Sequence, residues 1–586
     1  MFLRSARTHR RRARRVVPLV AGAATLALLA ACSGGDGGGS GSTGASGDGS
    51  TLVAYTGQSG DYQVNFNPFS PSRIGGLGAI YEQLFFINKA AESDPVPLLG
   101  TEYTWNDDGT ELQVTLRDDV TWSDGEPFTA DDVVFTYDLL ASTPAINNVG
   151  YAGTATATDD THVTFAFEAP AFVQGPDVLS GVPIVPEHLW ADVDPTADVV
   201  ENPVGTGAYV LGDFKPQAFT YTANPDYWGG EPAVKTIRFL SLSGNTAGAD
   251  GIANGTIDWQ TGPVPDIQNV AENFPGYDTL TAAQNQMVLA TCSSVELGCS
   301  GPQTDPAVRH ALYLAMDRTQ LNQLAFEETA SEISPTFALT STQEATISAD
   351  VEEPVAPEKA DPEGAAAVLE AAGWAKGSDG IYAKDGERLT VTVEVVTGWT
   401  DYITAVQTIA QQAKAAGIDV QTAQSSWNEW TERRTQGNFQ LAIDSLWQGP
   451  APDPYYLYTY FFSSATGAPV GEAAGNNYSR YANPDVDAAL ESLKTMPLDD
   501  AEARQPYFDT IQAAVVEDMP YIPILTGGTT SEWNVGGFTG WPTEDDMYAF
   551  PAVWSAFDAA EIFKRLEPAA GRGDPGRAAR ATRAAA

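Results

Sequence analysis

Aromatic side chains are concentrated in one late segment of the chain. Residues 427–462 hold three tryptophans and four tyrosines, which are Trp427, Trp430, Trp447, Tyr455, Tyr456, Tyr458 and Tyr460. Trp427 and Trp430 are three residues apart and would share one face of a helix. Such rings either fill a core or form a platform on which a ligand stacks, with nearby polar groups such as Gln448 binding its hydrogen-bonding atoms. The segment is therefore the first candidate for a binding site.

Residue patterns that support catalysis or metal binding are sparse. The four histidines, His9, His162, His188 and His310, lie far apart, and the sequence has neither an HExxH motif nor a CxxC pair. No nucleophile elbow precedes a helix, and no Walker motif is present. We therefore expect no metal, no cofactor and no ATP hydrolysis by this chain. Two carboxylates facing each other across a cleft could still catalyse glycoside hydrolysis. A secreted carbohydrate-active hydrolase is therefore the alternative function.

Composition and charge limit the possible partners. The 586 residues exceed what one hydrophobic core usually organises, and 43% of them are hydrophobic, as in a globular protein. The net charge is −45, so the surface repels phosphate backbones and anionic lipid headgroups. Nucleic acid is therefore excluded as a partner, and adjacent acids such as Asp107 and Asp108 are expected to be solvated.

The first 32 residues indicate export. A cationic stretch at 4–15 precedes an apolar run at 16–31, which is too short for a transmembrane helix and ends in Leu29-Ala30-Ala31-Cys32. This ending resembles a bacterial lipobox, so residues 1–31 are predicted to be a signal peptide and Cys32 a lipidation site. An ordinary signal peptide with a chance cysteine is the alternative, and either the general or the twin-arginine route would fit. The Gly/Ser-rich residues 32–51 form a flexible tether.

The two remaining cysteines close a small loop. Cys292 and Cys299 are seven positions apart, and an oxidising compartment outside the cell favours a disulfide between them. The alternative is a pair of free buried thiols.

Strand and helix patterns alternate along the mature chain. Residues 112–116, 162–167 and 389–395 alternate as half-buried strands, and helical patterns cover 306–317, 362–372 and 404–416. Pro362 at the first helical position, and Gly373 and Gly417 after the last turns, are typical helix boundaries. The helix that ends at Gly417 runs into a short strand at 417–420. These patterns predict the α/β class with mixed sheets.

Several of these segments resemble the extracellular solute-binding proteins of family 5, the lipoprotein receptors of ABC importers for peptides, oligosaccharides and nickel. The resemblance rests on the segments 108–138 (DGTELQVTLRDDVTWSDGEPFTADDVVFTYD), 203–209 (PVGTGAY), 224–228 (NPDYW), 305–312 (DPAVRHAL) and 481–487 (YANPDVD). These segments keep the family order over residues 52–565. Thr129 is the expected N-cap of the helix in the first segment.

The resemblance implies a periplasmic-binding-protein-like fold of class II, with two lobes joined by a hinge and an extra subdomain. Lobe I would comprise residues 52–74, 186–280 and 525–565, the inserted subdomain 75–185, and lobe II 281–524. Residues 566–586 would form a disordered tail. The solute would be enclosed between the lobes, and closure would signal to the permease.

The resemblance also implies which residues bind the solute. Trp447 matches a pocket tryptophan, but Pro450 stands where peptide receptors carry the aspartate that binds the α-ammonium. Asp453 is the nearest replacement, and Arg434 is a candidate for a carboxylate. A buried ammonium without a partner is costly, whereas a neutral sugar stacks on rings and needs only hydrogen bonds. The full set of expected ligand-binding residues is Trp447, Trp427, Trp430, Gln448, Asp453, Tyr455, Arg434, Asn65 and Asn67.

We therefore expect a lipid-anchored, non-enzymatic receptor on the extracellular face of the membrane. It would act as a monomer and deliver an oligosaccharide or a peptide to ABC permease subunits, with oligosaccharide favoured. The absence of clustered histidines disfavours nickel. A structural lipoprotein or adhesin is a third reading, which would explain the tether but not the ordered segments.

Overall fold

The computed structural model describes residues 50–57, 61–70, 72–91 and 93–569, without the side chains of Asn245, Trp427 and Asn428. The expected signal peptide, Cys32 and residues 570–586 lie outside this part of the chain. Among the described residues, no helix joins the length and apolar composition that crossing a membrane requires.

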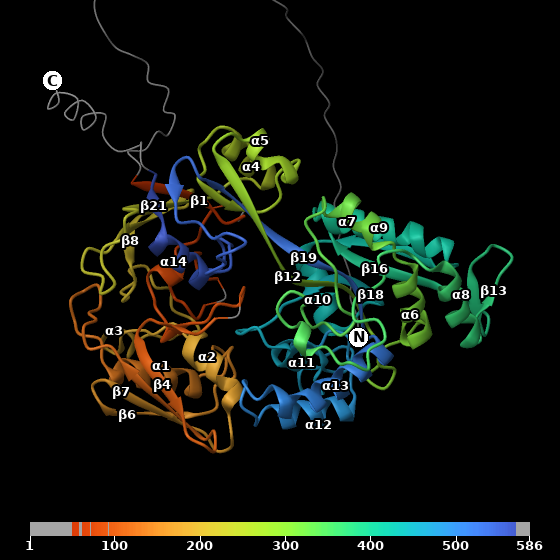
Figure 1. Ribbon diagram of the computed structural model, residues 1–586, viewed down its shortest axis with the longest axis horizontal. Coiled ribbons are helices and arrows are strands. Elements are labelled where there is room, and N and C mark those ends of the chain that lie inside the picture. The colour runs from red at the N-terminus through yellow and green to blue at the C-terminus, as the bar shows by residue number, and fades with distance from the viewer. Residues whose placement is uncertain (1–49, 58–60, 71, 92, 570–586) are drawn as a thin grey trace, which may run out of the picture. The chain divides into compact units, whose positions relative to one another are not determined.

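A ten-stranded mixed sheet organises the fold (Figure 1). Its strands, in sheet order, are β17 (Asp419–Ser425), β16 (Thr390–Val396), β18 (Leu441–Leu446), β12 (Tyr277–Thr291), β19 (Tyr521–Asn534), β11 (Trp259–Thr261), β1 (Thr51–Tyr55), β10 (Thr236–Leu240), β9 (Ala218–Ala223) and β8 (Tyr209–Lys215). The long strands β12 and β19 pair antiparallel from Tyr277 opposite Asn534 to Ala290 opposite Tyr521. They therefore join a first strand group (β1 and β8–β11) to a second strand group (β16–β18).

A separate four-stranded antiparallel sheet lies in the inserted segment, and three small sheets complete the strand set. The four-stranded sheet has the order β4 (Gly100–Trp105), β5 (Glu111–Leu116), β7 (His162–Ala166) and β6 (Thr154–Asp159). The small sheets are β2 (Phe85–Phe86) with β3 (Val96–Pro97), β13 (Ala375–Lys376) with β14 (Tyr382–Lys384) and β15 (Glu387–Arg388), and β20 (Phe538–Thr539) with β21 (Glu567–Pro568). Because β21 pairs with β20, ordered structure continues past residue 566, where the sequence suggested that a tail begins.

Fourteen α-helices are present in the described part of the chain, with short 3₁₀ helices between them. The α-helices are α1 (Ala130–Ser142), α2 (Gly175–Ser180), α3 (Glu187–Trp190), α4 (Asn245–Ala253), α5 (Val270–Asn273), α6 (Pro306–Ala315), α7 (Arg318–Ala325), α8 (Pro362–Ala371), α9 (Thr400–Ala415), α10 (Trp427–Gln436), α11 (Pro454–Phe462), α12 (Pro484–Leu493), α13 (Ala501–Asp518) and α14 (Ala556–Arg565). The 3₁₀ helices are η1 (Leu77–Ala79), η2 (Phe172–Gln174), η3 (Ile267–Asn269), η4 (Pro302–Thr304), η5 (Glu344–Thr346) and η6 (Ser464–Thr466).

The local signals in the sequence are largely confirmed. The three predicted strands correspond to β5, β7 and β16, and the three predicted helices to α6, α8 and α9. Thr129 is the N-cap of α1, and its backbone N–H donates to the Asp132 carboxylate at 3.0 Å. Gly373 and Gly417 have φ of 87° and 84°, as glycines that end helices do. Helix α9 begins four residues before the predicted start.

Two large hydrophobic cores support the sheet. The first contains buried side chains of β1, β9 and β10, of the inserted sheet and of α14, and the second contains those of β16, β18, α6–α9 and α11–α13. Strand β12 contributes Leu280 to the first core and Met287–Ala290 to the second. The expected division into two lobes and an inserted subdomain, with its residue boundaries, stays a prediction.

Cys292 and Cys299 form a disulfide directly after β12. Both cysteines are buried in the second core. The bridge therefore fixes the loop that leads from the long strand β12 into η4 and α6.

Candidate functional site

Three tryptophans follow the three strands of the second strand group. Strand β16 is parallel to both β17 and β18, so the carboxyl ends of the three strands meet at one edge of the sheet. Trp399 follows β16, Trp427 follows β17 and Trp447 follows β18. Open α/β sheets bind ligands outside the carboxyl ends of their strands. This edge is therefore the place where the fold predicts a binding site.

The turn after β18 lies on helix α11. The Trp447 ring stacks near Tyr460 with a centroid distance of 4.2 Å, yet 44% of Trp447 is exposed. Gly449, at φ 99°, lies so close to this helix that a Cβ there would be 2.4 Å from the Cβ of Tyr456. A side chain at 449 would therefore push the turn off α11. The packing holds one indole against Tyr460 while it leaves the indole accessible, as a stacking platform requires.

Gln448 supplies a buried amide beside the exposed indole. Its Oε1 accepts a hydrogen bond from Nε2 of Gln343 at 3.4 Å. Its own Nε2 has no hydrogen-bond partner among the described residues. Because buried polar groups are normally paired, this enclosed N–H₂ group is an unused hydrogen-bond donor.

A pocket of about 610 Å³ lies beside the long strands and is called the hinge pocket below. It is lined by the end of β11, by residues of β12 and β19, by the segments 324–330 and 398–404, and by Trp554. Trp399, Tyr402 and Trp554 give it aromatic walls. The residues that line it, all in the described part of the chain, include the acids Glu327 and Asp401 and neither lysine nor arginine.

The sequence did not single out the hinge pocket. Trp399 belongs to neither a quoted motif nor the aromatic segment, and Trp554 comes from a loop far along the chain. A signal was nevertheless available for Trp399, because it follows the strand predicted at 389–395.

Other residues expected at the site have structural roles. Trp430 is 1% exposed, and its ring lies 5.4 Å from that of Trp399 and 4.3 Å from the Arg434 guanidinium. Tyr455 is buried on α11. The side chain of Trp427 lies outside the described part of the structure. Trp430 and Tyr455 therefore support the wall from within rather than presenting a face to a ligand.

The two early asparagines hold a turn rather than face a ligand. The Oδ1 atom of Asn65 accepts from the backbone N–H of Asn67 at 3.1 Å, and the Oδ1 atom of Asn67 accepts from that of Phe69 at 3.0 Å. Nδ2 of Asn67 donates to the carbonyls of Pro195 and Asp198. Both side chains are buried, and these internal bonds use the groups that a ligand would need.

The arginines near the aromatic segment are paired with acids. Arg434 donates to Asp444 at 2.5 Å, and Arg433 donates to Glu394 at 3.0 Å. Burial raises the pKa of the Asp444 carboxyl, and the neighbouring Arg434 lowers it. The positive charge of Arg434 is thus used inside the protein, which differs from its expected role as a partner for a ligand carboxylate.

Asp453, the expected substitute for the missing ammonium partner, is also paired. Its carboxylate caps α11 by accepting from the Tyr455 backbone N–H at 2.9 Å. Arg504 of α13 donates to both of its oxygens, with Nη2 to Oδ1 at 3.1 Å, and Arg504 is only 2% exposed. A buried bidentate pair leaves little of this carboxylate for a solute.

A different carboxylate approaches α11 from the inserted segment. Asp177 lies on α2, is half-buried, and has no charged or hydrogen-bonding partner in the described part of the chain. Burial raises the pKa of Asp177 to about 7. Its negative charge in turn helps to raise the pKa of the hydroxyls of Tyr456 and Tyr460, the two tyrosines beneath the Trp447 turn. No local sequence signal marks Asp177, because α2 and α11 are far apart in the chain.

Metal binding finds no support in this geometry. No three His, Cys, Asp or Glu side chains within the described ranges are grouped so that they could hold a metal ion. What the site offers is aromatic surface, amides and single carboxylates, which suit an organic solute.

The fold is that of the periplasmic binding proteins of the oligopeptide-binding type. A crystal structure of a periplasmic oligopeptide-binding protein of Thermotoga maritima superposes with a TM-score of 0.81 and 23% identity, covering 89% of this chain and 99% of that one. A second structure of that protein, with bound mannohexaose, gives 0.76 and 24% with the same coverage. The oligopeptide-binding protein AppA of Bacillus subtilis, in complex with a nonapeptide, gives 0.70 and 20%, covering 89% and 99%.

The sequence identifies the family. Residues 94–468 match the model of the bacterial extracellular solute-binding proteins, family 5. Protein XP55 of Streptomyces lividans is 32% identical over 424 residues, which cover 71% of this chain and 73% of that protein. The chain belongs to family 5 of the bacterial extracellular solute-binding proteins. Its members are binding receptors and not enzymes, which excludes the hydrolase alternative.

Proposed function

We propose that this protein is the lipid-tethered receptor of an ABC importer and captures an oligosaccharide on the aromatic wall at Trp447. The choice of solute rests on two features of the aromatic segment. The Trp447 indole is exposed, and the arginines near the segment are already neutralised. Arg433, Arg434 and Arg504 are each paired with an acid. A free peptide needs a partner for its carboxylate, whereas a sugar ring needs a stacking face and hydrogen-bond donors and acceptors.

Two relatives support the breadth of the proposal. The Thermotoga maritima protein binds mannohexaose in its crystal structure, and the Bacillus subtilis AppA structure holds a nonapeptide. The same fold therefore accommodates extended solutes of both classes. The residues at the strand ends decide between them, and in this chain Trp447 and Gln448 favour the sugar.

Thermal-shift screening of the full-length protein tests the choice. The panel comprises manno-, cello- and xylo-oligosaccharides and di- to pentapeptides. A ligand at 100 times its dissociation constant stabilises the folded state by about 2.7 kcal/mol, which is a shift of a few degrees. Stabilisation by saccharides, lost in Trp447→Ala, is expected. Stabilisation by peptides alone would overturn the sugar assignment and leave the receptor class intact.

The tether is a separate part of the proposal. Lipid on Cys32, followed by the Gly/Ser-rich linker, would hold the receptor near its permease while allowing it to reorient. Cys32→Ala is expected to release the protein from the membrane fraction and to abolish incorporation of radiolabelled fatty acid. The double variant Cys292→Ser/Cys299→Ser is the control, because it removes both cysteines of the disulfide and leaves Cys32 in place. Retention of Cys32→Ala with membranes would contradict lipid anchoring.

A further inference from the structure

Asp177 is an acid whose charge nothing in its surroundings balances. It is half-buried on α2, and burial alone accounts for the rise of its pKa to about 7. Three carboxylates in or near the aromatic segment have arginine partners: Arg504 for Asp453, Arg434 for Asp444 and Arg433 for Glu394. A half-buried carboxylate without a cation is costly to the folded protein. The cost is relieved when a ligand brings the cation.

The position of Asp177 is fixed by a direct contact between α11 and the inserted segment. The Tyr456 hydroxyl donates to the carbonyl of Val173 at 2.9 Å, one helical turn before Asp177. The Val173 side chain is buried in the second core together with residues of α11, although its segment belongs to the insertion. The segment that leads into α2 therefore contacts α11 at Val173.

The same helix carries the exposed indole. Tyr460 stacks with Trp447 at 4.2 Å, and the hydroxyls of Tyr460 and Tyr456 both experience the negative charge of Asp177. Tyr137 of α1 experiences it too, but its own hydroxyl donates to the Val178 carbonyl. Tyr460 thus both contacts the Trp447 ring and experiences the charge of Asp177, which relates the carboxylate to the indole through one side chain of α11.

We infer that Asp177 binds an ammonium group of the solute beside the Trp447 ring. A carboxylate and an aromatic face together favour an organic cation, since the first supplies charge and hydrogen-bond acceptors and the second a cation–π contact. A single carboxylate offers too few oxygens for calcium or magnesium, which take six or more ligands. The inference rests on the proposed function and deepens it, because the bound saccharide or peptide would carry an amine.

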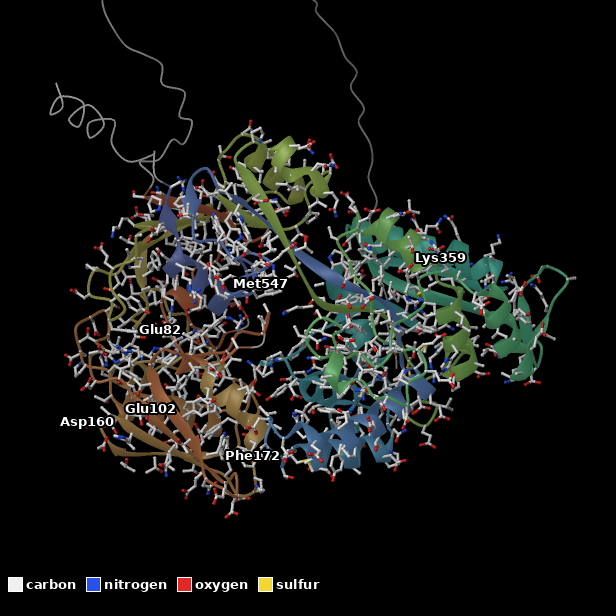
Figure 2. The ribbon with its side chains drawn as sticks, in the orientation of Figure 1. Glu82, Glu102, Asp160, Phe172, Lys359 and Met547 are labelled. Atoms are coloured by element: carbon white, nitrogen blue, oxygen red, sulfur yellow. A yellow bond between two sulfur atoms is a disulfide. The ribbon has the colours of Figure 1, made fainter. Side chains whose placement is uncertain are left out.

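Matched pairs of probes separate the contribution of the ammonium charge to binding from that of the rest of the ligand. Glucosamine tetramer and its fully N-acetylated form differ in the ammonium groups, as do tetraalanine and N-acetyl-tetraalanine. Titration calorimetry at pH 7, below the α-amino pKa of about 7.7–8.0, measures each probe on the full-length wild type and on Asp177→Asn. The control is Asp160→Asn, which removes one negative charge from the same inserted segment at its outer edge, away from Phe172 (Figure 2).

At least one amine probe is expected to bind wild type ten-fold or more tightly than its acetylated partner. Asp177→Asn should abolish that preference, and Asp160→Asn should keep it. Equal binding of both saccharide forms, unchanged in Asp177→Asn, would overturn the Asp177 assignment and leave the saccharide receptor standing. If only the peptide probes show a preference for the amine form, and Asp177→Asn loses it, the role of Asp177 would stand and the choice of a saccharide as the solute would be overturned. Binding of none of the four probes would count against both.

Discussion

Asp453 and Asp177 both lie near helix α11, and they differ in what neutralises them. Asp453 stands at the start of the helix, close in sequence to Trp447, and is neutralised by the buried Arg504 of α13. Asp177 reaches the same helix from the inserted segment and has no such partner among the described residues. An acid that is already paired stabilises the fold, whereas an unpaired acid destabilises it until a ligand arrives. The second kind is the better candidate for binding.

The largest effect expected from this comparison is on the Asp453 pair. Arg504→Ala leaves the Asp453 carboxylate without its cation in a largely buried place, which should reduce the free energy of unfolding by about 3–5 kcal/mol. Denaturant unfolding measures the loss. The double variant Asp453→Asn/Arg504→Met removes both charges and should recover much of it. An Arg504→Ala protein as stable as wild type would show that Asp453 is not held by this pair.

Two tryptophans, Trp430 and Trp447, allow a comparison between a ring that supports the wall from within and a ring that is accessible to a ligand. Trp430 is buried, so Trp430→Ala should cost about 3–5 kcal/mol of stability. Trp447 is 44% exposed, so Trp447→Ala should cost less than about 1 kcal/mol while weakening ligand binding at least ten-fold. Denaturant unfolding and titration calorimetry on both variants separate the two roles. A Trp447→Ala variant with unchanged affinity would remove the platform from the account.

The last prediction concerns how the effect of Asp177 on the stability of the folded protein depends on pH. Because the pKa of Asp177 is raised to about 7 in the folded state, the folded protein binds a proton that the unfolded chain releases above its lower, ordinary pKa. Asp177 therefore destabilises the fold increasingly as pH rises from about 4 to 7. Asp177→Asn should be more stable than wild type by about 1–2 kcal/mol at pH 8, a value reduced for partial exposure, and should match it near pH 4.

Thermal unfolding of both proteins across this pH range measures the difference. A variant that is less stable than wild type at pH 8 would mean that a group in the protein already compensates the Asp177 charge. Asp160→Asn, at an exposed position of the same inserted segment, is the control for the loss of one negative charge.

Sequence reasoning succeeded where the signal is local. The cap at Thr129, the helix start at Pro362, the glycines at 373 and 417 and the alternation in β16 each depend on residues within a few positions, and all are present in the structure. The family motifs then predicted the α/β fold of the class. The site was harder, because whether Asp453 is available depends on Arg504, which is 51 positions away.

Asp177 illustrates what could not be predicted. Its relation to α11 arises from the bond between Tyr456 and Val173, whose residues are 283 positions apart. Neither residue type nor spacing near 177 indicates that contact. In a fold whose walls are built from distant segments, the availability of a charged side chain is a property of the tertiary structure.

Titration calorimetry of wild type and Trp447→Ala with mannohexaose, cellohexaose and tetraalanine determines whether Trp447 is a platform for saccharides. We expect at least one saccharide to bind the wild type with one site per chain, with a negative heat-capacity change from burial of the indole, and to be recovered intact. Trp447→Ala should weaken that binding at least ten-fold. Binding of tetraalanine alone, with equal affinity in both proteins, would contradict the account.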